Sequence, residues 1–95
     1  MELKEAVRTA KTYILDLYAE EQISEVGLEE IEFDEGRGRW NITIGFRRPG
    51  VTTTANGDFL AILRQQEKRS YKVVQLRDAD GALLSVKDRL LRDAA

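Results

Sequence analysis

Five carboxylates lie close together in the first third of the chain and are the first residues to consider for chemistry. They are Glu29, Glu30, Glu32, Asp34 and Glu35. Clustered carboxylates can hold a metal ion or act as general acids and bases. In an extended strand only Glu30, Glu32 and Asp34 share a face, about 6.5 to 7 Å apart, and do not converge on one ion. The pattern therefore favours a solvated strand face.

Two glycine-containing segments resemble ligand-binding loops. Asp78-Ala79-Asp80-Gly81 begins like a calcium loop, but Arg89 stands where the twelfth-position glutamate is needed. Gly36-Arg37-Gly38 lacks the strand-to-helix context of a phosphate-binding loop. We interpret both segments as hairpin turns.

The sequence contains neither histidine nor cysteine. The usual ligands of zinc, copper and haem are therefore missing, and nucleophile-histidine catalysis is excluded. Disulfides and thiolate chemistry are excluded as well. We expect a non-enzymatic protein with no cofactor and no metal site.

The charges are segregated along the chain although the net charge is only -2. Residues 1–36 are mainly acidic and residues 37–77 mainly basic. The basic 47–72 segment predicts phosphate or nucleic-acid binding, which aromatic side chains would strengthen by stacking on bases. The strand alternation places Trp40 and Phe46 in the core, so nucleic-acid binding is the alternative, not the first hypothesis.

An apolar cluster accompanies the basic segment and includes Phe59 and Leu63. It either closes one end of the core or forms an exposed partner surface. The candidate partner-binding residues are Arg47, Arg48, Phe59, Leu63, Arg64, Lys68 and Arg69.

These side chains must be positioned by one small domain, residues 1–95. The composition is 42% hydrophobic and 34% charged with a single proline, which is typical of a globular protein. The N-terminus does not resemble a secretory signal, and no apolar run approaches the roughly 18 residues that span a bilayer. We expect a cytoplasmic location.

The strongest structural signal is a hairpin between Glu29 and Phe46. A two-residue type II′ turn at Gly36-Arg37 would pair Glu35 with Gly38 and set the register of both strands. The resulting pairs are Asp34 with Arg39, Phe33 with Trp40, Glu32 with Asn41 and Ile31 with Ile42. A bulge near Glu29-Glu30, or an irregular entry into the strand, would reconcile this phase with that of the preceding residues. The alternation predicts that Trp40, Ile42, Ile44 and Phe46 point into the core.

The rest of the chain supplies a helix and a second hairpin. Apolar residues at spacings of three and four predict an amphipathic helix over residues 2–21, with a stripe formed by Leu3, Val7, Ala10, Ile14 and Leu17. Residues 58–67 are expected to form a short helix, with an extended strand or an ordered loop as the alternatives. The second hairpin joins strands at 71–77 and 82–87, with Val74, Leu76, Leu84 and Val86 facing the helix. The end, 88–95, extends the last strand, forms one helical turn or frays.

These elements predict an α+β fold with one long N-terminal helix packed on a four-stranded antiparallel meander. The order of the helix, the Glu32–Ile42 hairpin and the later strand ending in Asp78-Ala79-Asp80-Gly81 resembles the PepSY layout. That resemblance implies a small domain that binds or restrains a partner protein such as a peptidase, with no catalytic residue.

We therefore expect a protein-interaction module that engages a protein partner or itself. The contact would use the second face of the sheet, a strand edge or the 48–69 segment. Homodimerisation is favoured by Val26, Leu28, Val73 and Leu83, which fall off the principal core face. A small-molecule pocket or enzyme between helix and sheet is the third hypothesis.

Overall fold

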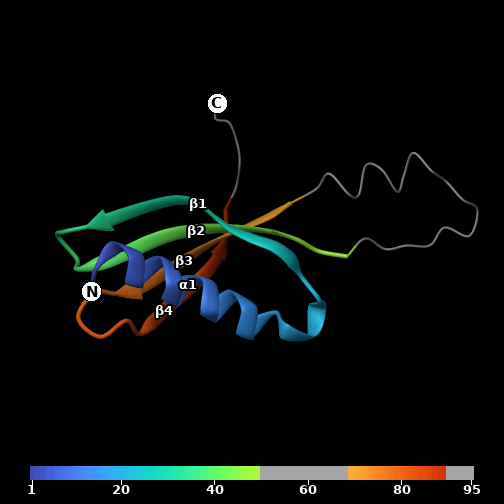
Figure 1. Ribbon diagram of the computed structural model, residues 1–95. Helices are drawn as coiled ribbons and strands as arrows, with labels where there is room; N and C mark the ends of the chain where they lie inside the picture. Colours follow the sequence, from blue (N-terminus) through green and yellow to red (C-terminus); the bar gives the residue numbers. More distant parts are fainter. Residues whose placement is uncertain (50–68, 90–95) are drawn as a thin grey trace, which may run out of the picture.

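A computed structural model of the chain describes residues 1–49 and 69–89. The elements follow in the order α1 (Leu3–Leu17), the 3-10 helix η1 (Ala19–Glu21), β1 (Ser24–Asp34), β2 (Arg39–Arg47), β3 (Ser70–Arg77) and β4 (Leu83–Asp88). The four strands form one antiparallel sheet in the order β1-β2-β3-β4. The helix α1 lies against one face of this sheet (Figure 1). The predicted α+β meander is confirmed.

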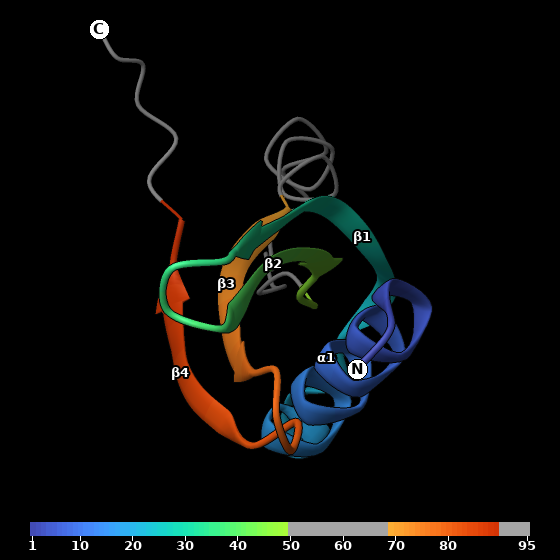
Figure 2. The same cartoon turned by 90° about the vertical axis from the view of Figure 1, so that its left-hand side faces the viewer.

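The sheet is curved around the helix. Figure 2 shows the strands in an arc from β1 to β4, with α1 on the concave side. The core therefore lies between α1 and the concave face. The convex face, which we call the second face, carries the alternate residues of each strand.

The predicted register of the first hairpin is correct, but the predicted turn is wrong. Asp34 lies opposite Arg39 and Phe33 opposite Trp40, as expected. The strands are joined by residues 35–38, and Gly38, not Gly36, has a positive φ of 64°. The N–H of Gly38 donates to the Asp34 carbonyl at 2.8 Å. A four-residue turn closed by a left-handed glycine thus replaces the tight II′ turn.

The strand β1 contains the predicted bulge. Its register with β2 shifts between Leu28 and Glu30, and a second shift lies between Ser24 and Gly27. These irregularities change which way the side chains of the strand point. Val26 therefore packs against the core, whereas it was predicted to lie off the core face. Leu28 lies opposite the buried Ile44 and so on the core side of the sheet, not off it as predicted, although its side chain is 41% exposed.

The strand β2 supplies the centre of the core. Ile42, Ile44 and Phe46 are fully buried, and Trp40 is 8% exposed. They alternate with residues of the second face, so the predicted inward quartet is confirmed. Val74 and Leu76 of β3, both fully buried, complete the sheet's contribution.

The helix buries a narrower stripe than its sequence pattern indicates. The buried residues are Ala6, Ala10 and Ile14, whereas Leu3 and Leu17, at the ends of the predicted stripe, are 51% and 55% exposed. At the two ends of α1 the neighbouring residues Met1 and Tyr18 pack against the core in place of these leucines. The α-helix stops at Leu17 and the turn η1 follows, which shortens the predicted 2–21 helix.

The second hairpin differs from the prediction by one residue. The turn ends at Gly81, whose φ of 71° is the expected left-handed conformation. Leu76 lies opposite Leu83, but Gln75 lies opposite Ser85, so the register shifts at Leu84. Leu83 therefore packs against the core in place of Leu84, and it does not lie off the core face as predicted.

Some predictions fall outside the described residues. They are the short helix at 58–67, the candidate residues Phe59, Leu63, Arg64 and Lys68, and the end of the chain from residue 90.

Candidate interaction surfaces

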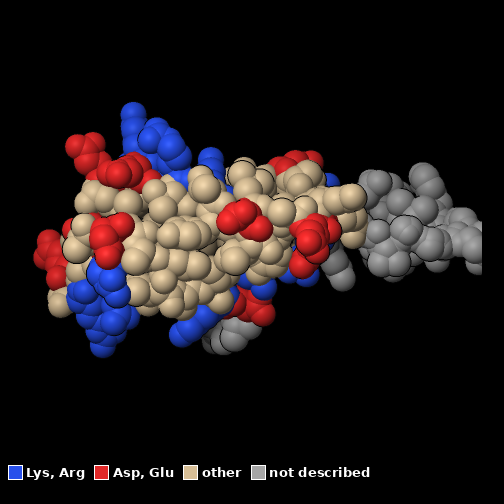
Figure 3. Space-filling view, turned by 90° about the horizontal axis from the view of Figure 1, so that it is seen from below, with Lys and Arg blue, Asp and Glu red and all other residues tan. Residues whose placement is uncertain are grey.

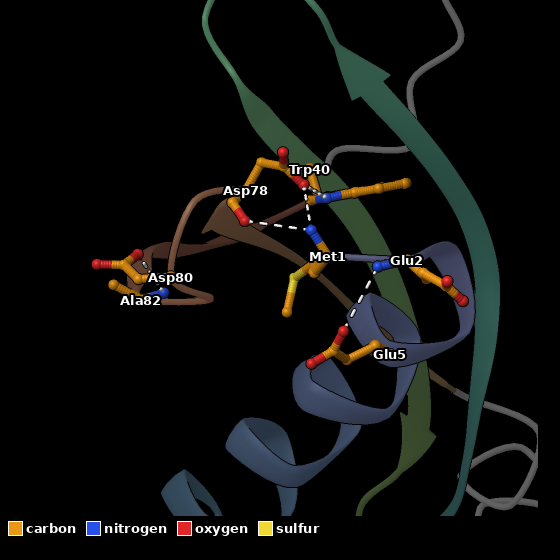
Figure 4. Close-up of polar contacts among 7 residues, drawn as sticks. All are labelled: Met1, Glu2, Glu5, Trp40, Asp78, Asp80 and Ala82. Atoms are coloured by element: carbon orange, nitrogen blue, oxygen red, sulfur yellow. Dashed lines mark hydrogen bonds and ion pairs between the residues drawn. The ribbon is translucent and has the colours of Figure 1, made fainter.

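The two hairpin turns meet the N-terminus at one end of the sheet. The α-amino group of Met1 donates to Asp78 Oδ1 at 2.9 Å, and the indole Nε1 of Trp40 donates to the same oxygen at 2.9 Å (Figure 4). The N–H of Asp78 also donates to the Gly38 carbonyl at 2.9 Å. One carboxylate thus ties the helix, β2 and the second turn together.

Sequence reasoning treated Asp78 only as a turn residue. No local signal links it to Met1, because 77 positions separate them in the chain. The remaining contacts at this end are local. Glu2 N–H donates to the Glu5 carboxylate in the first turn of α1, and Ala82 N–H donates to Asp80 Oδ1 at 3.0 Å.

Both partners of the terminal ion pair titrate away from their ordinary range. The hydrogen bond to Asp78 is the main cause that raises the pKa of the Met1 α-amino group above 8.0. The hydrogen bond from the same amino group, followed by that from Trp40, lowers the pKa of Asp78 below 3.8. The stabilisation by the amine is present below pH 8 and is lost as the pH rises through its raised pKa. The stabilisation by Asp78 is present above its ordinary pKa and is lost as the pH falls through the lowered value.

We therefore expect Asp78→Asn to reduce stability most between about pH 4 and pH 8. Asparagine keeps an acceptor for the Trp40 indole but removes the charge that faces Met1. Urea unfolding of both proteins across this range and up to about pH 10, with a free Met1 amine in each, measures the difference. The difference should shrink above about pH 8. A difference that is constant with pH would contradict a role for the ion pair.

The arginines proposed for partner binding lie at the opposite end of the sheet and have acidic neighbours. Arg47 Nε is 3.1 Å from Glu25, and Arg48 is 3.7 Å from Glu21. Arg69 is 3.3 Å from a carboxylate oxygen of Glu29 and donates to the Glu25 carbonyl at 3.1 Å. Each of these three arginines thus has a carboxylate beside it.

Aromatic rings form the other side of this end. The Tyr18 and Phe46 ring centroids are 5.2 Å apart, and the Arg48 guanidinium lies 5.3 Å from the Tyr18 centroid. Lys72 forms an ion pair with Asp88, and the hydrogen bond between them is the main cause that raises the pKa of Lys72 and lowers that of Asp88. At this end of the sheet, paired charges thus surround the half-buried ring of Tyr18 and the buried ring of Phe46.

The second face is polar and crossed by ion pairs. Arg89, just after β4, bonds Glu30 of β1, so one pair reaches from one border of the sheet to the other. Beneath it Thr43 is only 4% exposed, and shallow grooves lie beside it. The grooves are lined by Glu29, Glu30, Glu32, Asn41, Thr43, Tyr71, Val73 and Arg89.

Glu29 also lies on this face, although the alternation of the sequence placed only Glu30, Glu32 and Asp34 together. A Cβ at Gly45 would lie 2.8 Å from the Glu29 carboxylate and from the Arg69 guanidinium. Because the bulge at Leu28–Glu30 changes the phase, Glu29 joins Glu30 on the second face. Further along, Arg39 donates to Gln75 at 3.2 Å and Gln75 donates to Asn41 at 2.8 Å.

The two edges of the sheet differ in how they are protected. The β1 edge carries both register shifts and five acidic side chains: Glu25, Glu29, Glu30, Glu32 and Asp34. Bulges and charges of this kind prevent edge strands from pairing. At the other border, residues 85–88 of β4 pair with β3 without interruption and include one lysine and one aspartate.

The main-chain groups of β4 point alternately toward β3 and toward the border of the sheet, which we call the open edge because no strand within residues 1–49 and 69–89 pairs there. Asp88 lies opposite Lys72, so the next residue, Arg89, lies opposite Tyr71. The N–H of Arg89 donates to the Tyr71 carbonyl at 3.0 Å, so these two residues form a hydrogen-bonded pair. Antiparallel hydrogen bonds join opposite residues at every second position. Ser85 and Lys87 therefore bond to β3, whereas the N–H and C=O groups of Val86 and Asp88 point away from it. Figure 2 shows this border across the molecule from β1 and α1.

The large apolar side chains that are exposed in the described part of the chain lie on α1 and β1. They are Leu3, Leu15, Leu17, Leu28 and Phe33, which are 39% to 55% exposed. Seen from below in Figure 3, the molecule presents a broad uncharged area that a few acidic groups interrupt. Nothing in the structure indicates what would cover it.

The described residues contain no group of three or more acidic side chains that could hold a metal ion. Within the same part of the chain, no helix has the length and apolar composition needed to cross a membrane. No family model matches the chain, and neither curated proteins nor solved structures include a significant match. The function must therefore be inferred from the molecule's own surfaces.

Proposed function

We propose that this chain is a non-enzymatic protein-interaction module that binds a protein partner at the open edge of β4. The observation that carries the proposal is the contrast between the two edges. The β1 edge has bulges and a row of acidic side chains, whereas β4 is regular from residue 85 to residue 88. A strand of the partner would continue the sheet through main-chain hydrogen bonds to Val86 and Asp88.

The wider context of the proposal follows from the sequence. A cytoplasmic location fits a chain without cysteine, because it forms no disulfides of the kind common in oxidising compartments. The role also agrees with what the PepSY-like resemblance implies, a small domain that binds or restrains another protein.

Nucleic-acid or phosphate binding by the basic 47–72 segment has less support. Arg47, Arg48 and Arg69 each lie beside a carboxylate, which a phosphate group would have to displace. Retention of an oligonucleotide at about 50 mM salt, lost at higher salt, would favour this alternative.

A proline substitution tests the β4 edge. The N–H of Val86 points outward, so Val86→Pro removes an edge donor while the donors of Ser85 and Lys87 still bond to β3. Val86→Ala is the matched control, because it removes apolar volume but keeps the amide. We expect the tagged wild-type chain and Val86→Ala to retain a partner from native lysate, and Val86→Pro to lose it.

Thermal melts should show that both variants remain folded at the temperature of the binding measurement. Equal retention by Val86→Pro and wild type would contradict binding at this edge. A wild-type chain that stays monomeric and captures no protein would contradict the interaction module itself.

A further inference from the structure

The open edge of β4 is complementary to itself. We infer that its partner is a second copy of this chain, joined through β4 of both copies in antiparallel orientation, with Val86 on the two-fold axis. The inference rests on the proposed function, because it names the partner of the same edge.

The main-chain geometry selects the possible registers. Only outward N–H and C=O groups can meet across the new interface, and those of Val86 and Asp88 point outward. When Val86 lies on the two-fold axis, its N–H and C=O groups form hydrogen bonds with the C=O and N–H groups of Val86 in the second copy. Shifts of one residue would place outward groups against inward ones, so the register can change only in steps of two.

The side chains then distinguish among these registers. With Val86 on the axis, Ser85 lies opposite Lys87 of the second copy, and symmetry makes this contact twice. A shift of two residues in one direction would place Lys87 opposite Lys87 of the second copy. The two like charges disfavour this register. A shift in the other direction brings Lys87 against Leu83. The chosen register alone gives a β-branched pair at the centre with a polar neighbour for each lysine.

The other combinations of edges are less favourable. Pairing β1 with β1 would bring two acidic rows together, and like charges across strands are destabilising. Pairing β1 with β4 is head-to-tail and leaves a free edge at each end, so it extends without closing. The β4 pair is isologous and closes after two copies. Its strand 83–88 carries one positive and one negative side chain, so the pairing involves no net repulsion.

The proposed dimer joins the two four-stranded sheets into one continuous sheet. A two-fold axis perpendicular to the sheet keeps both helices on the same side. The polar second faces also become continuous, and Ser85 and Lys87 of each copy lie at their junction.

Charge substitutions at Ser85 and Lys87 test both the edge and the register. Sedimentation equilibrium at low salt gives the dimer dissociation constant of the full chain. We expect Ser85→Lys to raise this constant roughly 2- to 30-fold, because two symmetric like-charge pairs form, and Ser85→Glu to lower it by a similar factor. The double variant Ser85→Lys with Lys87→Glu should reverse the loss and bind about as tightly as Ser85→Glu, because it forms the same two opposite-charge pairs with the signs exchanged. Thr12→Lys, on the exposed side of α1, adds the same charge as a control and should have no effect.

Two results would overturn the inference. One is a wild-type chain that is monomeric at every concentration. The other is a dimer whose dissociation constant does not respond to charge at Ser85 or that the double variant fails to restore. A monomeric chain that still captures a different protein in a Val86→Pro-sensitive manner would overturn the second-copy inference and leave the proposed function standing.

Discussion

Replacing Trp40 with alanine should unfold the protein or leave it barely folded. The side chain is 8% exposed, its ring centroid lies 4.7 Å from that of Phe33, and its indole donates to Asp78 at 2.9 Å. Truncating a buried tryptophan costs about 3 to 5 kcal/mol. The stability of a domain this small lies toward the low end of about 5 to 15 kcal/mol, so the loss removes most of it.

Thermal unfolding followed by circular dichroism measures this effect. Each kcal/mol shifts the midpoint of a small domain by about 4 to 8 °C, so Trp40→Ala should melt at least roughly 12 °C below wild type. Trp40→Phe is the matched control, because it keeps an aromatic ring and removes only the fused ring and the indole N–H. The melting midpoint of Trp40→Phe should lie between those of Trp40→Ala and the wild-type protein. A melt of Trp40→Ala that is identical to wild type would defeat the assignment of this end of the core.

The inward quartet of β2 was predictable because strand alternation is a local signal. Trp40, Ile42, Ile44 and Phe46 occupy every second position, and one register satisfies the apolar and the charged faces together. Turn type was less predictable. Both Gly36 and Gly38 can adopt a left-handed conformation, so the residue types alone do not show which glycine does so. In the structure Gly38 adopts it, and its N–H donates to the Asp34 carbonyl.

The errors in the helix and in β4 share a physical cause. Periodicity identifies which side of α1 is apolar, but which of its residues become buried depends on the position of the sheet, and Leu3 and Leu17 stay exposed while Met1 and Tyr18 pack against the core. In β4 the extra residue Leu84 shifts the register, so that Leu83 points toward the core and not away from it as predicted. A bulge depends on pairing with another strand, so a single segment does not reveal it.

The candidate surfaces were only partly predictable. The sequence located these arginines and the acidic residues but did not show which of them lie together, namely Arg47 beside Glu25 and Arg69 beside Glu29. The predicted meander placed the last strand at a border of the sheet, but the register shift at Leu84, which leaves residues 85–88 as its regular part, was not predicted. The tie between Met1 and Asp78 depends on the whole fold, since helix and turn meet only when the meander is complete.

Replacing Phe46 with alanine should destabilise the opposite end of the core by about 3 to 5 kcal/mol. Phe46 is fully buried, and Tyr18 packs against it with ring centroids 5.2 Å apart. Phe46→Leu retains most of the apolar volume and should cost less than about 1.5 kcal/mol. Urea unfolding of both variants measures the difference, and near-ultraviolet circular dichroism reports the loss of packing around Tyr18. Equal stability of Phe46→Ala and wild type would contradict the burial of this ring.

The mild variants at the two ends provide a further test of the core. Trp40 and Phe46 are six residues apart on one strand, about 20 Å, and have no aromatic partner in common. Substitutions at this distance usually add to within about 0.5 kcal/mol. The double variant Trp40→Phe with Phe46→Leu should therefore lose the sum of the two single effects in one cooperative transition. Two separate transitions would mean that the ends of the sheet unfold independently, and the helix would then not join them into one core.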